Sequence, residues 1–412
     1  MGWISVKVVQ INSSCGSGST GKICAAISSI LDCYEIENYI FYSGFKKNTF
    51  QNGFLINGKA DIRIHQVLSR LFGDQGWHSY FSTKKLVKQL EKINPDVIHL
   101  HNLHGYYLNM DVLFDYLSRA NKPVIWTLHD CWGFTGHCSH FTVIKCDKWK
   151  THCFACPQKR AYPYSLFLDR SSELFNRKKK LYRSIRSMTV TTVSNWLAEQ
   201  VKESALLSGR EIEVIPNGIN TEVFTPTEWL SQIGGVPIRD KKIVLGVANN
   251  WGPRKGLQDF IELSEHLSDD YLIVLVGLSD AQKKELPHNV IGISRTDHVQ
   301  QLVALYSTAD VYVNPSMEET FGLTTIEAMA CGTPAVVYNS TASPELICSA
   351  TGRIVEPHDI EGLQKCIFEI TGKGKAQYSS ACIDYVRANF SESIGYEKYI
   401  ALYMKLTGKM YE

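Results

Sequence analysis

The sequence predicts an α/β protein with two doubly wound domains, each a parallel sheet covered by helices on both faces. Short β-branched apolar runs alternate with segments of helical spacing, and this alternation occurs twice along the chain. The length of 412 residues supports the division, because a single core rarely grows beyond about 300 residues. Hydrophobic residues make up 44% of the chain, which is enough for two cores.

The first series of predicted strands lies within residues 1–220, and the second within residues 241–391. The first series reads VKVVQIN, NYIFYS, DVIHLHN, PVIWTLHD, MTVTTVS and EIEVIPNG, with helical spacing between the runs, as at 23–31 and 84–93. The second reads KKIVLGVAN, YLIVLVG, NVIGIS, DVYVNPS, TPAVVYN and GRIVEP, with a helix expected at 257–267. Residues 221–240 read as a linker, and a last helix at about 392–412 can pack back on the first domain.

Ligands of such sheets bind beyond the carboxyl ends of the strands, so we expect a site in the cleft between the two domains. The net charge of +2 gives no reason to expect a nucleic-acid partner. No apolar run approaches the ~20 residues of a membrane span, and the N-terminal MGWISVKVVQIN reads as a strand rather than a signal peptide. We therefore expect a cytoplasmic protein whose twelve cysteines are thiols or metal ligands.

The stretch GSGSTGK, residues 16–22, follows the first predicted strand and has the glycine spacing of a phosphate-binding P-loop. A P-loop needs Ser or Thr next, to hold Mg²⁺, and this chain has Ile23. The stretch therefore reads as a strand-to-helix turn whose backbone N–H groups can contact an anion, with Gly18, Thr20 and Gly21 as candidates.

The most informative stretch is NPSMEETFGLTTIEAMACGTPAVV, residues 314–337. We expect a helix from Leu323 to the terminating Gly332. Glu319 before this helix and Glu327 within it can accept hydrogen bonds from two hydroxyl-bearing groups of one extended ligand. Between them, the N–H groups of the helix start can bind a phosphate, and they belong to Phe321, Gly322 and Leu323. A sugar, a phosphate and a ribose in line describe a nucleotide sugar.

This stretch resembles the signature of family 4 retaining glycosyltransferases, with the Glu–seven residues–Glu spacing and the continuation EAMACGTP. VIPNGINTEVF at 214–224, NWGPRKGLQDFIEL at 250–263 and TLHD at 127–130 fall where that family has counterparts, so the resemblance covers nearly the whole chain. It implies the GT-B fold, in which an acceptor-side and a nucleotide-sugar-binding Rossmann-like domain face each other across a cleft. It also implies that Glu319 contacts the donor sugar and that Glu327 contacts the ribose hydroxyls.

The resemblance further implies transfer with retention of anomeric configuration, in which a departing phosphate oxygen takes the acceptor's proton. His129 would contact the transferred sugar, with Asp130 orienting it. Arg254 and Lys255 follow the first strand of the second domain, where two cations can neutralise a diphosphate leaving group. No Asp-x-Asp occurs, so we expect catalysis without a metal cofactor.

Further contacts follow from the strand ends. The anion of the GSGSTGK turn is then the donor diphosphate or a nearby acceptor group, and Ser294 and Arg295 are expected near the base. The acceptor side falls to HLHNLHGYYLN, residues 99–109, with His101, Asn102 and Tyr106 as contacts together with Asp130. A metal site at His101 and His104, and ordinary packing of these residues, are the alternatives.

Five cysteines lie within residues 131–156, and Cys153 and Cys156 form a Cys-x-x-Cys pair. Together with Cys138 and Cys146 they can complete a structural zinc site, for which free thiols and a disulfide are the alternatives.

Residues 170–187 combine seven basic residues with one Asp or Glu, Glu173, and place apolar residues at near-helical spacing. Such a helix can lie on an anionic membrane, here the inner membrane surface, or simply expose a solvated face.

The function expected is transfer of a sugar from a nucleotide-sugar donor to a glycan or polyprenyl-diphosphate-linked acceptor, in the synthesis of a bacterial surface polysaccharide such as O-antigen, capsule or exopolysaccharide. A non-catalytic nucleotide-sugar-binding protein of the same fold is the main alternative. A P-loop phosphotransferase is the other, against which Ile23 argues.

Overall fold

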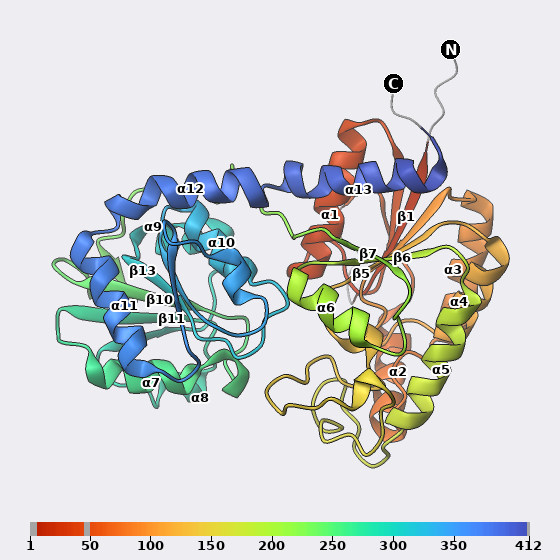
Figure 1. The fold of residues 1–412 in the computed structure, drawn as a ribbon, viewed down its shortest axis with the longest axis horizontal. Helices are drawn as coiled ribbons and strands as arrows, with labels where there is room; N and C mark the ends of the chain where they lie inside the picture. Colours follow the sequence, from red (N-terminus) through yellow and green to blue (C-terminus); the bar gives the residue numbers. More distant parts are fainter. Residues whose placement is uncertain (1–5, 45–49, 410–412) are drawn as a thin grey trace. The chain divides into compact units, whose positions relative to one another are not determined.

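The computed structural model describes residues 6–44 and 50–409, which divide into two compact units. Unit 1 contains the described residues up to Pro216 together with those from Gly395 onward, and unit 2 contains Asn217–Ile394. In Figure 1 each unit has a central sheet with helices around it.

The described part of unit 1 has a seven-stranded parallel sheet in the order β3-β2-β1-β4-β5-β6-β7. Its strands are β1 (Lys7–Asn12), β2 (Glu37–Tyr42), β3 (Gly53–Leu55), β4 (Val97–Leu100), β5 (Val124–Leu128), β6 (Met188–Thr192) and β7 (Glu211–Val214). The helices are α1 (Gly18–Cys33), α2 (Lys59–Phe72), α3 (Tyr80–Ile93), α4 (Met110–Ala120), α5 (Ser171–Ser184) and α6 (Asn195–Glu203). Since β4 and β5 are buried throughout, their apolar sequences read as continuous runs rather than as alternation.

The described part of unit 2 has a six-stranded parallel sheet in the order β12-β11-β10-β13-β14-β15 and a small antiparallel hairpin, β8-β9. The strands are β8 (Gln232–Ile233), β9 (Val236–Pro237), β10 (Lys242–Val247), β11 (Tyr271–Val276), β12 (Val290–Ile293), β13 (Val311–Asn314), β14 (Ala335–Tyr338) and β15 (Gly352–Val355). The helices are α7 (Leu257–His266), α8 (Asp280–Lys283), α9 (Val299–Thr308), α10 (Leu323–Ala330), α11 (Ile360–Lys373) and α12 (Ala376–Phe390).

All twelve strands expected from the sequence are present, and both large sheets are parallel, which confirms the predicted fold class. The short strand β3 and the hairpin β8-β9 were not predicted, because two or three residues carry no readable period.

The last helix, α13 (Glu392–Thr407), belongs to unit 1 from Gly395 onward. There Tyr399 and Tyr403 are buried, and their hydroxyl groups reach Thr127 and His99 of the sheet. The final helix thus contributes side chains to the core of unit 1.

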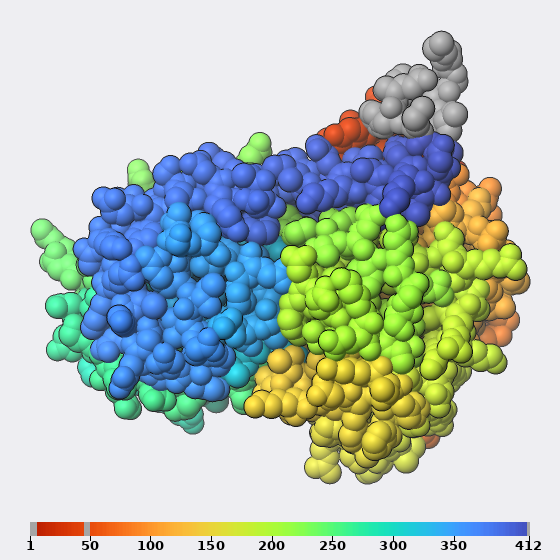
Figure 2. Space-filling model, in the orientation of Figure 1, coloured from red at the N-terminus to blue at the C-terminus, as the bar shows by residue number. Residues whose placement is uncertain are grey.

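Between β5 and α5 runs a long segment, residues 129–170, whose regular structure is two single turns, η1 (Trp132–Phe134) and η2 (Lys148–Lys150). In the space-filling view its residues (yellow) form a lobe at the lower end of unit 1 (Figure 2). Aromatic side chains fill its interior, since Phe134, Phe141 and Trp149 pack on one another and are buried.

In each sheet the strand order reverses at one point: between β1 and β4 in unit 1, and between β10 and β13 in unit 2. The loops after these strands diverge to opposite faces and leave a crevice where ligands of open α/β sheets bind. Most of the residues selected from the sequence follow these strands or β5.

Candidate active site

In unit 2, the turn after β10 is fixed to the loop after β13. The backbone carbonyl of Arg254 accepts a hydrogen bond from the Met317 N–H (2.9 Å), and Arg254 Nη1 donates to the Glu318 carbonyl (2.7 Å). Gly256 makes this approach feasible: its φ is +72°, and a Cβ there would lie 2.5 Å from the Pro315 carbonyl oxygen. Two loops on either side of the switch point therefore form one surface.

Lys255 and Glu319 form an ion pair across this junction, and their side chains are only 21% and 13% exposed. Burial opposes ionisation of Glu319, but the charges of Lys255 and Arg254 and the hydrogen bond from Lys255 outweigh it and lower its pKa. The Glu319 N–H donates to Thr341 Oγ1 (2.8 Å), which holds the backbone. Glu319 is thus a fixed carboxylate beside two cations.

Helix α10 begins directly after this loop, as predicted, and ends before Gly332, whose φ is +77°. Its N-cap is Gly322, which has a φ of +108° and no side chain to cap the first turn. The first-turn N–H groups, which include that of Leu323, therefore have no side-chain cap and can bind an anion, as the sequence suggested. Phe321 is buried and packs against Phe390.

Glu327 lies in α10, where its Oε2 accepts a hydrogen bond from the hydroxyl of Tyr306 (2.9 Å). Tyr306 lies on α9 and is fully buried, so its hydroxyl holds the Glu327 carboxylate from the side of the core. The sequence analysis did not identify Tyr306. The only sequence feature that could have indicated it is a tyrosine, which carries a hydroxyl group, on the apolar face of a helix.

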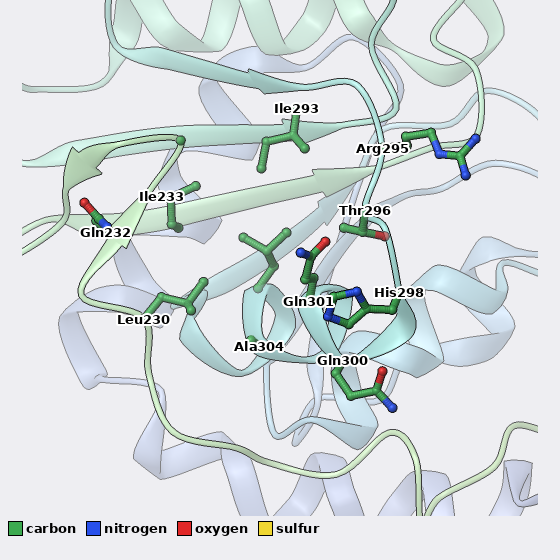
Figure 3. A pocket seen from close by; sticks show the side chains of 12 residues that line it. Leu230, Gln232, Ile233, Ile293, Arg295, Thr296, His298, Gln300, Gln301 and Ala304 are labelled. Atoms are coloured by element: carbon green, nitrogen blue, oxygen red, sulfur yellow. The ribbon is translucent and has the colours of Figure 1, made fainter.

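A pocket lies beside the edge strand β12. Its volume of about 380 Å³ is within the size range of small-molecule sites. Ile233 and Ile293 line one side of it and Gln301 and His298 another, whereas the guanidinium group of Arg295 points away (Figure 3). Ser294 is exposed and donates to Asp280 (3.3 Å). Of the two residues predicted near the base, Arg295 lines the pocket and Ser294 is its neighbour in the chain.

In unit 1, the GSGSTGK turn leads into α1 and leaves the helix start uncapped by its N-cap residue, Ser17. Gly18 is exposed at a φ of +66°, and Thr20 Oγ1 accepts a 3.4 Å bond from Asn12. Gly21 has no room for a side chain, since a Cβ would lie 2.7 Å from Ser14 Oγ. A P-loop needs the hydroxyl of a Ser or Thr at position 23 to hold Mg²⁺, and this chain has the buried Ile23 there. The turn therefore offers backbone N–H groups but no ligand for Mg²⁺.

Three imidazole rings lie next to one another at the carboxyl ends of β4 and β5: His99 is within β4, His101 follows β4 and His129 follows β5. The rings of His99 and His101 lie 4.0 Å apart, and those of His101 and His129 lie 5.3 Å apart. His101 Nδ1 lies 3.0 Å from His129 Nε2, and His101 Nε2 lies 3.1 Å from Gln10 Oε1. Burial keeps these rings neutral: it lowers the pKa of His129 to about 4 and that of His101 well below its usual value.

This chain of contacts determines where the protons sit. The Gln10 amide N–H donates to the Cys24 carbonyl (3.1 Å), so Gln10 Oε1 faces His101 and must accept. His101 therefore carries its proton on Nε2 and accepts at Nδ1 from the Nε2–H of His129. His129 is left with Nδ1 as its acceptor nitrogen. The sequence signal for Gln10 was a polar residue within an apolar strand, and it was missed.

His101, predicted as an acceptor contact, is 1% exposed with both nitrogens engaged, so it supports His129 instead. Asp130, predicted to orient His129, instead pairs with His104 (2.6 Å) and accepts the Trp132 N–H (2.9 Å). Burial opposes ionisation of Asp130, but the His104 contact outweighs it and lowers the pKa of Asp130 to about 2.

The remaining acceptor candidates lie around His104. Its Nδ1 contacts the hydroxyl of Tyr162 (2.8 Å), and the ring of Tyr106 packs edge-on against that of Tyr162. Tyr106 also hydrogen-bonds Arg70. The backbone of Asn102 is held, because its N–H donates to Asn12 and its carbonyl accepts from Tyr107.

The four cysteines predicted as zinc ligands lie in the lobe between β5 and α5. Cys138 and Cys156 hydrogen-bond each other, and Cys153 Sγ accepts the Gly136 N–H (3.2 Å). Cys146 lies close enough to Cys153 to interact with it electrostatically. Among residues 6–44 and 50–409, however, no three or more His, Cys, Asp or Glu side chains are arranged to hold a metal ion. The structural zinc site at these four cysteines stays a prediction.

The basic segment 170–187 forms α5, but its apolar side chains face the core, since Leu174, Phe175, Tyr182 and Ile185 are buried. Even Lys178 is fully buried, where it lies over the Trp132 ring (3.4 Å) and donates to the Trp132 carbonyl (2.6 Å). The segment therefore exposes no apolar face that could insert into a bilayer. Its amphipathic pattern arises because its apolar side chains pack within unit 1. In the described part of the chain, no helix has both the length and the apolar character to cross a membrane.

Two family models match the chain: "Glycosyltransferase Family 4" over residues 36–223 and "Glycosyl transferases group 1" over residues 232–385. The chain is 25% identical over 331 residues to the "Putative colanic acid biosynthesis glycosyl transferase WcaC" of Escherichia coli (strain K12), covering 76% of this chain and 77% of the relative. It is 30% identical over 171 residues to a D-inositol 3-phosphate glycosyltransferase of Corynebacterium jeikeium, covering 36% and 40%.

Solved structures share the fold at low identity. Sucrose-phosphate synthase from Thermosynechococcus elongatus superimposes with a TM-score of 0.70 at 19% identity, over 98% of this chain and 99% of that one. Anabaena Alr3699/HepE, in complex with UDP and glucose, gives 0.66 at 16% identity, over 97% and 100%. With the two family models matching successive parts of the chain and these folds matching nearly all of it, the protein is a GT-B glycosyltransferase whose first half belongs to glycosyltransferase family 4 and whose second half belongs to glycosyl transferases group 1.

Proposed function

We propose that this enzyme moves a sugar, with retention of anomeric configuration, from a nucleotide sugar to a glycan acceptor in the synthesis of a bacterial surface polysaccharide. One observation carries the proposal: the Lys255–Glu319 ion pair beside the uncapped start of α10, at the switch point of the sheet of unit 2. Cations, backbone N–H groups and a fixed carboxylate in one place match a diphosphate next to a sugar.

The donor would be held by unit 2. Arg254 and Lys255 would neutralise the diphosphate together with the N–H groups of α10, since Arg254 has five N–H donors and uses one on Glu318. Glu319 would accept from sugar hydroxyls and Glu327 from the ribose. The pocket beside β12 would take the base. Anabaena Alr3699/HepE, of the same fold, was solved with UDP and glucose, which supports a ligand of this class.

In the proposed step the bond from the anomeric carbon to the diphosphate oxygen breaks, and the diphosphate leaves with the electron pair. The acceptor hydroxyl forms its bond on the same face, and its proton passes to the departing phosphate oxygen. Arg254, Lys255 and the helix start stabilise the developing charge, so we expect no requirement for a divalent cation. His129 would contact the transferred sugar, with its ring held by His101 and Gln10.

The acceptor side would belong to unit 1. The matched relative WcaC is named for colanic acid biosynthesis, which supports a polysaccharide acceptor for this chain as well. We further propose that the acceptor is linked to a polyprenyl diphosphate and that the enzyme works at the cytoplasmic face of the inner membrane.

A thermal-shift screen across nucleotide sugars tests the donor, because a ligand at ~100 times its dissociation constant adds ~2.7 kcal/mol of stability. The donor found is then used in transfer assays with Glu319→Ala and Lys255→Ala, which should lose activity while retaining their fold. Unchanged turnover in both variants refutes the assignment, and donor binding without hydrolysis or transfer points to a non-catalytic binder.

Two further assays separate the remaining alternatives. Activity that stops with a chelator and returns with Mn²⁺ refutes metal-independent catalysis. ATP turnover that Lys22→Ala abolishes would favour a phosphotransferase.

A further inference from the structure

Helix α2 of unit 1 has an apolar face that residues 6–44 and 50–409 leave exposed. Its buried residues are Ile62, His65 and Ser69, so a partly polar side of the helix faces the core. On the opposite side, Ile64 and Val67 are 59% and 56% exposed and Leu71 is 37% exposed. Spacings of three and four residues put these three side chains on one stripe.

A second exposed apolar group lies beside the end of α2. Leu166, Phe167 and Leu168 are 39%, 68% and 45% exposed, and the Leu166 N–H donates to the Arg70 carbonyl of α2 (2.7 Å). At Gly73 a Cβ would lie 2.8 Å from the Leu168 carbonyl oxygen, so the loop lies tightly against the helix terminus. We name the stripe, Phe72 and this loop together the α2 surface.

Cations flank the stripe along one side of α2. Lys59, Arg63 and Arg70 are exposed and share the flank next to Val67. The nearby acids are engaged: Asp61 accepts from Asn57 (3.0 Å), Asp74 pairs with His78 and Arg170, and Asp169 accepts two backbone N–H groups. An apolar stripe with a basic flank suits a helix lying in the interface of an anionic bilayer.

The surface also connects to the acceptor candidates. The Arg70 side chain hydrogen-bonds the hydroxyl of Tyr106, whose ring packs against Tyr162, and Tyr162 contacts His104. If the acceptor is lipid-linked, as proposed above, its diphosphate must lie near the headgroups, and this connection places the acceptor residues beside them.

We propose that the α2 surface docks unit 1 on a membrane of anionic phospholipid. Ile64, Val67, Leu71 and Phe167 enter the boundary between headgroups and acyl chains, and Lys59, Arg63 and Arg70 meet the phosphates. The exposed face of α5, from which membrane contact was expected, is polar and mostly basic, so it adds at most attraction over a distance.

The test is sedimentation of the full-length protein with vesicles of phosphatidylcholine alone, or mixed with phosphatidylglycerol. Wild type should partition at least tenfold more strongly onto the anionic vesicles, and Val67→Ser/Phe167→Ser should lose at least tenfold of that binding. Lys59→Gln/Arg63→Gln should weaken binding and reduce its salt dependence. Ile354→Ser, at a 43% exposed apolar residue of unit 2, is the matched control and should bind like wild type.

Thermal melting of each variant separates lost binding from lost folding, since these side chains are exposed. Equal binding of Val67→Ser/Phe167→Ser and wild type, or no preference for anionic vesicles, overturns the proposal. So does a solution dimer that Val67→Ser/Phe167→Ser disrupts in the absence of vesicle binding. Because the assay needs no nucleotide sugar, its failure leaves the proposed transfer reaction to be judged by its own experiments.

Discussion

The ammonium group of Lys255 lies against the carboxylate of Glu319, and this ion pair joins the turn after β10 to the loop after β13. Both side chains are mostly buried, so neither charge is well compensated without the other. The pair holds a carboxylate and a cation at the one place in unit 2 where the strand order reverses.

Removing either partner should lower catalysis, and because it leaves the other charge uncompensated, it should also lower the free energy of unfolding. We expect Glu319→Gln and Lys255→Met each to lower kcat/KM by about 100-fold, or ~3 kcal/mol in the barrier. Lys365→Met is the control, because Lys365 is exposed on α11 of unit 2 and has no role in the proposed site, and it should remain within a few-fold of wild type. A similar small effect in all three variants would show that the ion pair serves packing alone.

Gly256 should tolerate no side chain. Its left-handed φ and the 2.5 Å approach of the Pro315 carbonyl to a Cβ predict that Gly256→Ala lowers the free energy of unfolding by about 2 kcal/mol and weakens donor binding. Gly252→Ala is the matched control, since a Cβ there meets nothing within 4 Å and its φ is −142°. Urea unfolding and donor titration measure the two effects, and equal behaviour of both variants contradicts the argument.

Gln10 should act on the reaction through the tautomer of His129. Gln10→Leu leaves the buried His101 without its acceptor, which typically costs about 1–3 kcal/mol, and we expect kcat to fall about tenfold with little change in donor KM. Imidazole ¹⁵N shifts should show a proton on Nε2 of His129 in wild type and a mixture of tautomers in the variant. Gln51→Leu, at an exposed glutamine, should change neither readout.

The buried histidines of unit 1 should make stability fall with acid. Burial lowers the pKa of His65 to about 3 and those of His129 and His137 to about 4, whereas the unfolded chain protonates near 6.5. Between those values the unfolded state binds more protons, so the free energy of unfolding decreases as the pH drops, by about 1.4 kcal/mol per histidine at about pH 5.5.

Urea midpoints measured from pH 7 to pH 5 should show this decrease, and His65→Gln should reduce its slope. A urea midpoint independent of pH would contradict the argument, because it would mean that these histidines bind protons equally well in the folded and unfolded states. Asp130, with its pKa lowered from 3.8 to about 2, acts in the same direction but only below this window, since its stabilisation is lost as the pH falls through those values.

Cysteine reactivity tests the zinc prediction against the paired thiols. The hydrogen bond between Cys138 and Cys156 raises the pKa of Cys138 and lowers that of Cys156, so iodoacetamide should label Cys156 before Cys138 and Cys153. Cys138→Ala should slow labelling of Cys156 several-fold, as read by peptide mass spectrometry. One zinc per purified chain with all four cysteines protected would instead establish the metal site.

The sequence by itself determined the two parallel sheets and the limits of α10, because periodicity, caps and glycines act over a few residues. It also brought Lys255, Glu319 and Glu327 to notice, since they lie at strand ends or on a helix of readable length. The partners of buried polar groups depend on contacts between distant residues, such as Asp130 with His104 and His101 with Gln10. No local pattern encodes those contacts.

The two amphipathic helices show the same division. In α5 the apolar side chains face inward, whereas in α2 a stripe of apolar side chains faces outward, although both helices are amphipathic. Periodicity specifies that apolar side chains share a face. Only the tertiary structure decides whether the protein's own core or something outside it covers that face.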